Sequence, residues 1–256
     1  AVLAEELSIV PMDHFAAVDP IPIASASIAQ VYKGTLHNGE EVILKIKRHG
    51  IQKIVQADLM LLKDLINMLT NYYSLVKEIN LIYVFEAFAK SIQEELSFPN
   101  ELNNIAHFRR NFKDEKTILL MQPYRQFSSE NIICLSYIEG VKINNIAGLK
   151  AYNLNVESTL DRVLNLFLDQ ILDHGFFHAD PHPGNILVAP DGKIAFIDMG
   201  AMGKVLPKDR ELLEDFIIYF INKDSNRLVS TLKKMALQID IGNEKMLERS
   251  IDELMH

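Results

Sequence analysis

Three polar side chains stand at spacings that could serve one reaction. Asp180 is followed five residues later by Asn185, and Asp198 comes shortly afterwards, two residues before Gly200. In the catalytic loop of protein kinases, an Asp at this spacing accepts the proton of the attacking hydroxyl and the Asn holds a magnesium ion. An Asp-x-Gly after the next strand supplies a second magnesium ligand. The pattern therefore predicts Asp180 as a catalytic residue and Asn185 and Asp198 as metal ligands.

A short hairpin is expected to fix the distance between Asn185 and Asp198. Apolar runs at residues 186–189 and 194–197 flank residues 190–193, whose Pro-Asp-Gly-Lys sequence favours a turn. Magnesium prefers oxygen ligands in near-octahedral geometry and is usually held by one or two side chains plus substrate phosphates. Two protein oxygens with open positions for phosphate are thus the expected arrangement.

The same stretch allows plainer interpretations. Asp, Asn and Gly are common turn residues, so each of them alone would indicate only a turn, and it is the joint spacing that favours catalysis. Zinc is another alternative, because His178 and His182 are four residues apart. Pro181 and Pro183 exclude the regular helix that would place both imidazoles on one face, and the Glu of a His-Glu-x-x-His site is missing. These two facts argue against zinc.

The composition bounds the class of protein. The chain has 256 residues, of which 48% are hydrophobic and 23% charged, enough for one large or two modest globular domains. A net charge of −8 argues against nucleic acid as a partner, since binding its phosphates requires a basic face.

Cys134 is the single cysteine, which excludes an intramolecular disulfide framework. It lies in an apolar run, which predicts a buried thiol. No apolar run is long enough to span a membrane. Because the chain begins at Ala1 rather than Met, we expect a piece of a longer protein.

Two extended runs near the start predict a phosphate-binding sheet. Residues 24–34 lead into an extended stretch, residues 37–40 carry a hairpin turn signal, and residues 41–47 alternate as a strand. Lys45 falls late in this second strand, where kinases place the lysine that binds the α- and β-phosphates. Taken alone, a strand lysine would be interpreted as a solvated edge residue.

Helical periodicity and helix-breaking prolines predict the remaining elements. A helix should restart at Pro99 with Ser97 or Phe98 near its entry, and its Glu101 is the candidate partner that would position Lys45. The helix over residues 58–69 should pack on most sides. The helix over residues 81–96 should carry a core-facing stripe of Leu81, Val84, Phe85, Phe88, Ile92 and Leu96. The expected helices cover residues 1–19, 58–69, 81–96, 156–173 and 207–220, with more helix after them.

A buried strand over residues 131–138 would complete the nucleotide pocket. In a kinase-like arrangement Leu135 would form a wall of the adenine pocket. The backbone C=O and N–H groups of Ser136 and Ile138 would then bind the base. Because the backbone makes these contacts, the side chains at the two positions can be of any type. Ser136 and Ile138 are therefore chosen by their place in the chain and not by their side chains.

Three motifs together resemble the UbiB family of atypical protein-kinase-like proteins, which is associated with ubiquinone biosynthesis and isoprenoid-lipid metabolism. The resemblance covers nearly the whole chain from about Pro20. It is carried by Ala-Ser-Ala-Ser-Ile-Ala-Gln-Val-Tyr at residues 24–32, by Glu-Leu-Ser at residues 95–97 with Glu101 and Asn104, and by Phe-His-Ala-Asp-Pro-His-Pro-Gly-Asn at residues 177–185.

The resemblance implies an α+β, two-lobed protein-kinase-like fold that binds ATP or ADP with magnesium. The N-lobe, residues 1–135, would hold a small antiparallel sheet, the nucleotide loop and a helical insert. The mostly helical C-lobe, residues 136–256, would hold the catalytic loop and metal site. By position, the family implies that Lys45 binds phosphate, that Glu101 pairs with Lys45 and that Asp180 is the catalytic residue. Asn185 and Asp198 would take the metal positions. The Ala-rich nucleotide loop would be formed by Ala24, Ser25, Ala26 and Ser27.

The chain departs from the family in two places. The Glu-x-Asp signature has Ser97 in place of the acid, and the Lys-x-Gly-Gln segment that works with it does not occur in this sequence. The nucleotide loop also differs from that of ordinary kinases, because residues 21–33 contain no glycine. The Cβ atoms of Ala24 and Ala26 restrict the backbone, so we expect a site biased away from fast phosphoryl transfer to proteins.

The short segment after Asp198 leaves little room for docking a peptide, and no Ala-Pro-Glu follows it. We therefore expect an ATPase or a small-molecule or lipid phosphotransferase rather than a protein kinase. Alternatives are a small-molecule kinase of the aminoglycoside or choline type, and a nucleotide-gated pseudokinase that binds a lipid or a protein. The family implies a lipid or quinone-precursor partner and a peripheral position on the cytoplasmic or mitochondrial matrix side of a membrane, or the cytoplasm in a bacterium.

Overall fold

The computed structural model describes residues 2–72 and 81–235 and the single residues 249, 251 and 253. Its contacts divide the chain into two compact units. One unit holds the described residues up to Leu160 together with Ala179–Met202, and the other holds Asp161–His178 together with the described residues from Gly203 onward. The predicted lobe boundary between residues 135 and 136 falls inside the first unit and stays a prediction.

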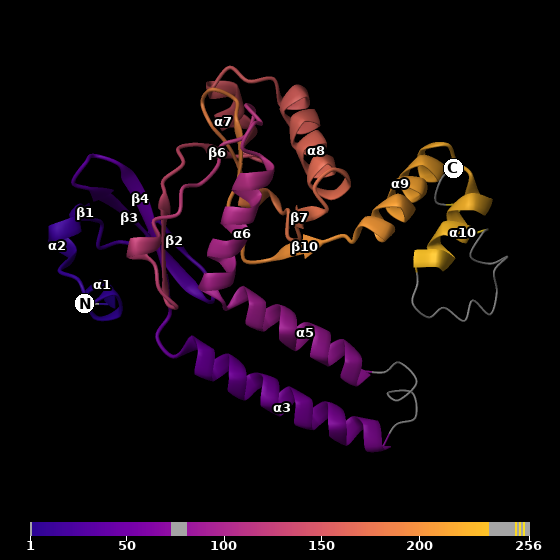
Figure 1. Ribbon diagram of the computed structural model, residues 1–256, viewed down its shortest axis with the longest axis horizontal. Coiled ribbons are helices and arrows are strands. Elements are labelled where there is room, and N and C mark those ends of the chain that lie inside the picture. The colour runs from indigo at the N-terminus through magenta and orange to yellow at the C-terminus, as the bar shows by residue number, and fades with distance from the viewer. Residues whose placement is uncertain (1, 73–80, 236–248, 250, 252, 254–256) are drawn as a thin grey trace. The chain divides into compact units, whose positions relative to one another are not determined.

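An antiparallel sheet forms the start of the first unit, with β1 to β4 drawn in indigo in Figure 1. The strand order is β1-β3-β4-β5, and β2 pairs with β3 outside this path. This is the small antiparallel sheet that the sequence predicted, and together with the surrounding helices it confirms the α+β class. The strands are β1 (Phe15–Val18), β2 (Ala24–Ser25), β3 (Ala29–Leu36), β4 (Glu41–Lys47) and β5 (Ile132–Ser136).

Strand β4 separates a hydrophobic core from a cavity. Its hairpin with β3 turns through the predicted residues 37–40, where Gly39 has a φ of +87°, a left-handed conformation that glycine adopts without a Cβ clash. Val42 and Leu44 point into a core that also contains Phe15, Leu36, Ile132 and Cys134. Successive side chains of a strand point to opposite faces, so Lys45 faces the cavity instead.

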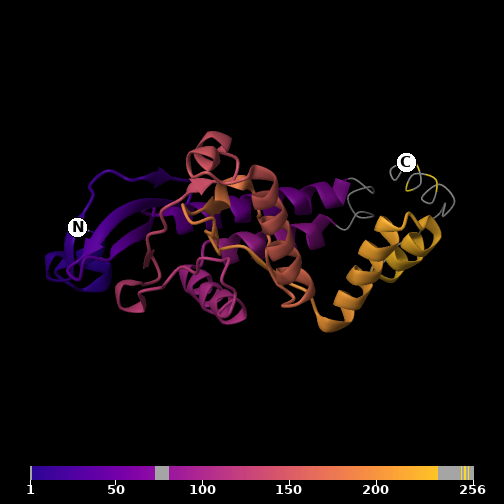
Figure 2. The same cartoon turned by 90° about the horizontal axis from the view of Figure 1, so that it is seen from above.

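Two long helices, α3 (Ile51–Tyr72) and α5 (Leu81–Glu95), lie side by side and run in opposite directions (Figures 1 and 2). Each is buried at one position within its bounds, Ile66 on α3 and Phe85 on α5. Among the described residues, most positions of both helices are exposed.

Two expectations about these helices are wrong. Residues 58–69 do not pack on most sides, because Leu62 and Leu65 are exposed. The stripe predicted on α5 is not continuous, because Val84 and Phe88 are exposed while Phe85 is buried. The apolar periodicity was sufficient to predict both helices, but it could not show which apolar residues have a neighbour.

Helix α6 (Phe98–Asn111) restarts the chain after α5, as the sequence predicted. Pro99 sits in its first turn, and the Ser97 hydroxyl accepts a hydrogen bond of 3.3 Å from the Asn100 N–H, which caps the helix. One face of the helix is buried. Its buried residues are Phe98, Glu101, Leu102, Ile105 and Phe108.

A second sheet of order β6-β8-β9 contains the predicted hairpin. Its strands are β6 (Val141–Lys142), β8 (Ile186–Val188) and β9 (Ile194–Phe196). Ile186 pairs with Phe196, and just outside that pair the Ile197 N–H donates to the Asn185 C=O at 2.8 Å. The ladder thus fixes Asn185 beside the residue that precedes Asp198. The shorter helices of this unit are α1 (Val2–Leu7), α2 (Pro11–His14), η1 (Arg125–Phe127), α7 (Ile146–Ala151) and η2 (Pro183–Asn185).

The second unit is mostly helical. It contains the greater part of α8, which ends before Gly175, a residue with a φ of +58° in keeping with the predicted C-cap. Strands β7 and β10 pair within a two-stranded sheet. The helices predicted over residues 156–173 and 207–220 are confirmed, and most of the chain after residue 235 lies outside the described residues. The elements are α8 (Val156–Leu172), β7 (Phe176–His178), β10 (Met202–Lys204), α9 (Pro207–Ile221) and α10 (Ser225–Met235).

The helical lead-in predicted for residues 1–19 is wrong in its second half. After two short helices, β1 pairs with β3 and buries Phe15 completely. The gain from burying this ring and pairing the backbone outweighs a weak local helix preference. None of the helices in the described part of the chain is long and apolar enough to cross a membrane.

Burial of Cys134 leads to a prediction about its chemistry. The thiol is fully buried in β5, and burial raises its pKa from 9.0 to about 12. At pH 8 we expect a thiol reagent to label the folded protein roughly a thousand times more slowly than the unfolded protein, because only the thiolate reacts. Since the folded thiol keeps its proton to higher pH, this group lowers stability as the pH rises from about 9 towards 12. Rapid labelling in native buffer would contradict the burial.

Candidate active site

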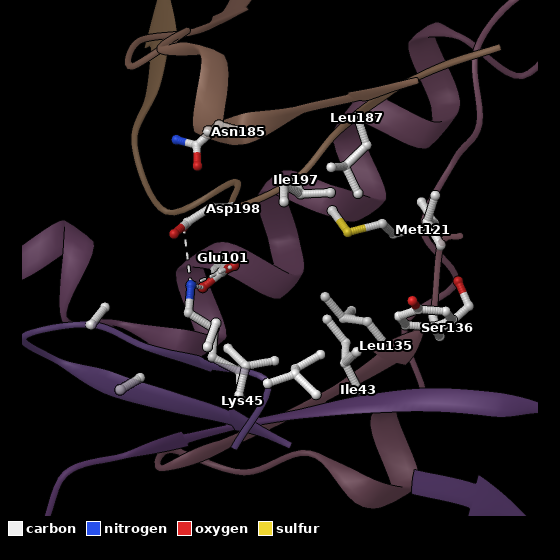
Figure 3. A pocket seen from close by; sticks show the side chains of 18 of the residues that line it. Ile43, Lys45, Glu101, Met121, Leu135, Ser136, Asn185, Leu187, Ile197 and Asp198 are labelled. Carbon is white, nitrogen blue, oxygen red and sulfur yellow. Dashed lines mark hydrogen bonds and ion pairs between the residues drawn. The ribbon is translucent and has the colours of Figure 1, made fainter. Parts of the chain in front are cut away.

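A cavity of about 310 Å³ lies on the face of the sheet that carries Lys45 (Figure 3). Most of its wall is apolar. The polar side chains of Lys45, Glu101, Asn185 and Asp198 belong to the predicted set, whereas Tyr137 and Lys142 also line the cavity and were not predicted. Ala24, Ala26, Ser136 and Ile138 of that set also line it. The apolar wall is formed mainly by Ile23, Ala29, Val31, Ile43, Met121, Leu135, Leu187 and Ile197.

The Lys45 ammonium joins two carboxylates that are distant in sequence. Its Nζ donates to Glu101 at 3.0 and 3.1 Å and to Asp198 Oδ1 at 3.0 Å. Glu101 comes from α6 and Asp198 follows β9, so this one side chain on β4 connects a strand, a helix and a loop (Figure 3). The predicted ion pair between Lys45 and Glu101 is therefore present.

Burial and charge act on this cluster in opposite directions. Burial lowers the pKa of Lys45, but the negative charges of Glu101 and Asp198 outweigh it and raise the pKa overall. Lys45 therefore stays protonated at neutral pH. Burial raises the pKa of Glu101, and Lys45 opposes that shift. Around Lys45 itself one ammonium faces two carboxylates, which favours a further cation at that point, while Lys142 adds a second positive charge to the cavity lining.

The backbone at Asp198 is strained and held from two sides. Asp198 has a φ of +65°, a left-handed conformation that costs a non-glycine residue about 1–3 kcal/mol. Helix α6 fixes the next residue, because the Asn104 side-chain amide donates to the Met199 C=O at 2.9 Å. A backbone hydrogen bond from Met199 also reaches the Glu101 carboxylate. These contacts determine where the Asp198 carboxylate points.

The loop from Asp180 to Asn185 is stabilised by a hydrogen bond between its two ends. The Asn185 side-chain nitrogen donates to the Asp180 C=O at 3.2 Å. In Figure 3 the Asn185 oxygen points towards Asp198. Asp180 itself does not line the cavity, and its side chain is 61% exposed, with His182 Nε2 3.8 Å away from its carboxylate. The Asp180 carboxylate is therefore open to solvent.

These oxygen atoms fit a magnesium site with few protein ligands. Among the described residues, no cluster of three or more His, Cys, Asp or Glu side chains could hold a metal ion. An ion at this site would therefore rely on the Asn185 and Asp198 oxygens together with phosphate, as magnesium commonly does.

The backbone at the end of β5 and just after it borders the cavity, and not all of its groups are bonded within the described part of the protein. The Ser136 N–H donates to the Gln122 C=O, and the Tyr137 N–H donates to the Glu41 C=O. Within the described residues, no hydrogen bond joins the Ile138 backbone to another protein group. Ser136 and Ile138 both line the cavity.

Arg48 is a site residue that the sequence did not reveal. Its Nε donates to the Ala26 C=O at 2.9 Å, and its Nη2 donates to the Ser25 hydroxyl at 2.8 Å. Ala24 and Ala26 line the cavity, whereas Ser25 and Ser27 do not. The arginine therefore ties the outer side of the Ala-rich loop to the end of β4. No local pattern signals this contact, because it depends on how the two segments meet in space.

Glu95, the first residue of the Glu-Leu-Ser motif, lies at the end of α5. Its pKa is raised by burial and then by the nearby charge of Asp198, so a third carboxylate borders the cluster. Two residues further on, Ser97 caps α6. An Asp at position 97 would serve equally well as a helix cap. The departure from the family's Glu-x-Asp signature therefore preserves the start of the helix that carries Glu101.

Fold and site together define a kinase-like protein, and the chain belongs to the ABC1 atypical kinase-like family. The family model matches residues 1–232. A probable protein kinase UbiB from Vibrio vulnificus is 32% identical over 89% of this chain and 42% of its own length. The chloroplastic protein ACTIVITY OF BC1 COMPLEX KINASE 7 from Arabidopsis thaliana is 33% identical over 90% of this chain and 33% of its own length. The UbiB resemblance is confirmed, and the chain spans less than half the length of these relatives.

A solved structure supports the same fold. Rv3197 from Mycobacterium tuberculosis, determined as a complex with erythromycin, is 25% identical with a TM-score of 0.70. The match covers 99% of this chain and 63% of that one. The kinase-like architecture predicted from the sequence is thereby confirmed.

The Asn104 contact predicts a specific loss. Replacing Asn104 with Ala removes a hydrogen bond worth about 1 kcal/mol and frees the strained Asp198 backbone, so ATP affinity should fall by at least about fivefold. Calorimetric titration with ATP and magnesium measures this. Asn103→Ala is the matched control, because Asn103 is an exposed neighbour on the same helix. Equal affinities of the two variants would show that Asn104 does not position the site.

Proposed function

We propose that this chain binds ATP or ADP with magnesium and acts as an atypical kinase or ATPase whose acceptor is water, a small molecule or a lipid headgroup. The observation that carries the proposal is the Lys45 ammonium held 3.0 Å from both Glu101 and Asp198 at the polar end of an apolar cavity. This places a fixed positive charge where phosphate oxygens would lie.

The cavity divides into two chemical parts. The base would lie against the apolar wall, with the Ser136 C=O and the Ile138 N–H as hydrogen-bonding partners, and Ala24 and Ala26 would cover the phosphates. The phosphates would reach Lys45, while Asn185 and Asp198 would hold magnesium. When bound, magnesium would neutralise the charge that develops on the transferred phosphoryl group.

Asp180 would act on the acceptor. Its carboxylate would take the proton of the attacking hydroxyl as the new oxygen–phosphorus bond forms and the bond from the γ-phosphorus to the bridging oxygen breaks. Asn185 would hold this loop in register through its hydrogen bond to the Asp180 C=O. Glu101 would keep Lys45 directed at the phosphates.

Slow or restricted turnover would follow from the Ala-rich loop. The Cβ atoms of Ala24 and Ala26 limit how closely the backbone approaches phosphate, and Arg48 holds the same loop from outside. This supports phosphotransfer to a small acceptor, or hydrolysis, over phosphorylation of proteins. The erythromycin complex of Rv3197 makes hydroxylated small molecules a sensible part of an acceptor screen. A lipid or quinone-precursor acceptor and a peripheral membrane position are the family-based part of the proposal.

The proposal is tested by Asp198→Asn with Asp191→Asn as matched control. Asp191 lies in the turn of the hairpin that leads to Asp198, and its side chain serves that turn. Asp198→Asn should lower magnesium-dependent ATP turnover by about two orders of magnitude, since a metal ligand charge is lost, whereas Asp191→Asn should retain it. Turnover is measured with and without membranes and phenol-like quinone precursors.

Two outcomes would contradict the proposal. Unchanged turnover in Asp198→Asn would remove the metal role. Stoichiometric phosphorylation of a protein substrate by the chain would overturn the choice of acceptor.

A further inference from the structure

The loop over residues 23–28 borders the cavity with little packing of its own. Residues 23–27 are exposed, although Ala24 and Ala26 line the cavity. None of the loop residues has a positive φ, so the loop takes its path without glycine and without strain of that kind. Hydrogen bonds, and not the burial of apolar side chains, therefore determine the shape of this loop.

Backbone hydrogen bonds attach the loop to β3. The Ile23 N–H donates to the Val31 C=O at 2.8 Å, and β2 pairs with β3 through its two residues. Further along, the Ala26 N–H donates to the Ala29 C=O at 2.9 Å, which closes a tight turn. These contacts use the N–H of Ala26 and leave its C=O to another partner.

Arg48 is that partner, and it lies just after β4. Its Nε donates to the Ala26 C=O at 2.9 Å, and its Nη2 donates to the Ser25 hydroxyl at 2.8 Å. Its backbone N–H also donates to the Ile28 C=O at 2.8 Å. Because the N–H groups of a guanidinium point in fixed directions within one plane, the two side-chain contacts set the angle of the loop as well as its position.

We propose that Arg48 is a positioning residue that turns the Ala26–Ser27 peptide so that its N–H faces the phosphates of the nucleotide. The C=O and N–H of a trans peptide point in opposite directions, and no cis peptide occurs among the described residues. Since the Ala26 C=O is held towards Arg48, the Ser27 N–H points away from Arg48. In the described part of the chain, no hydrogen bond uses this N–H.

The position of Arg48 favours this indirect role over a direct contact with phosphate. Arg48 does not line the cavity, whereas Ala26 does, so the arginine holds the loop from the side away from the ligand. Its grip keeps the negative end of the Ala26 peptide away from the phosphates and leaves the positive end to them. Each of these contacts joins two groups within residues 23–48, and none depends on whether further chain covers the outer face. The role rests on the nucleotide function proposed above.

The test compares ADP with adenosine, which has no phosphate, by calorimetric titration in the presence of magnesium. Arg48→Ala should bind ADP at least about tenfold more weakly than the wild type, the loss of one hydrogen bond to a charged group, and adenosine within about twofold of it. Arg48→Lys keeps the charge but not the planar fork, so it should lose ADP affinity as well. Lys53→Ala is the matched control, because it removes an exposed cation at the start of α3, and it should bind both ligands like the wild type.

A second measurement needs no nucleotide. Without Arg48 the turn at Ala26 should open more often, so the Ala26 amide should exchange with solvent at least about threefold faster in Arg48→Ala than in Lys53→Ala. Because both substituted residues are exposed, the melting temperatures should stay nearly unchanged. Equal exchange rates would show that Arg48 does not hold the loop.

The binding results separate this role from its alternatives. An equal loss of ADP and adenosine affinity in Arg48→Ala would overturn the role in phosphate binding. Wild-type ADP affinity in Arg48→Lys, or an equal loss in Lys53→Ala, would show that charge alone matters and would overturn the orienting role. If Arg48→Ala bound ADP like a wild-type chain that does bind it, only the role of Arg48 would fall. A wild-type chain that bound no ADP would contradict the proposed function itself.

Discussion

The three-way contact between Lys45, Glu101 and Asp198 is the interaction on which the site depends. It joins strand β4, helix α6 and the segment after β9 through one ammonium group. Removing Lys45 would leave the Glu101 carboxylate buried without a compensating charge, because Glu101 is only 1% exposed. The arrangement is therefore held together by its own electrostatics, while the same carboxylates leave room for a divalent cation.

Much of the surrounding structure serves to maintain that contact. The Ser97 cap fixes where α6 begins, and the buried face of α6 fixes which way Glu101 points. Asn104 holds Met199, and the β8–β9 hairpin sets the approach of the chain from Asn185 to Asp198. Strain at Asp198 is tolerated because neighbours on both sides determine its backbone.

The sequence was informative wherever one residue type had to stand at a fixed spacing. The loop from Asp180 to Asn185, the hairpin before Asp198, the strand with Lys45 and the Pro99 restart each have a local signal, and their elements were predicted correctly. Arg48 was missed. Glu95 and Asn104 were singled out as motif residues, but their contacts were not foreseen, because these contacts join segments far apart in the chain. The exposed faces of α3 and α5 were misjudged for the same reason, since periodicity reveals an apolar face but not its neighbour.

The measurement that tests the central claim most directly is the affinity of the wild-type chain for ATP, by calorimetry, with magnesium and with EDTA. If Asn185 and Asp198 hold a cation between the protein and the phosphates, affinity should fall by at least about tenfold when magnesium is removed. Lys45→Met should lower further the ATP affinity that remains without magnesium. ATP that binds equally well in EDTA, and equally well to Lys45→Met, would contradict this account.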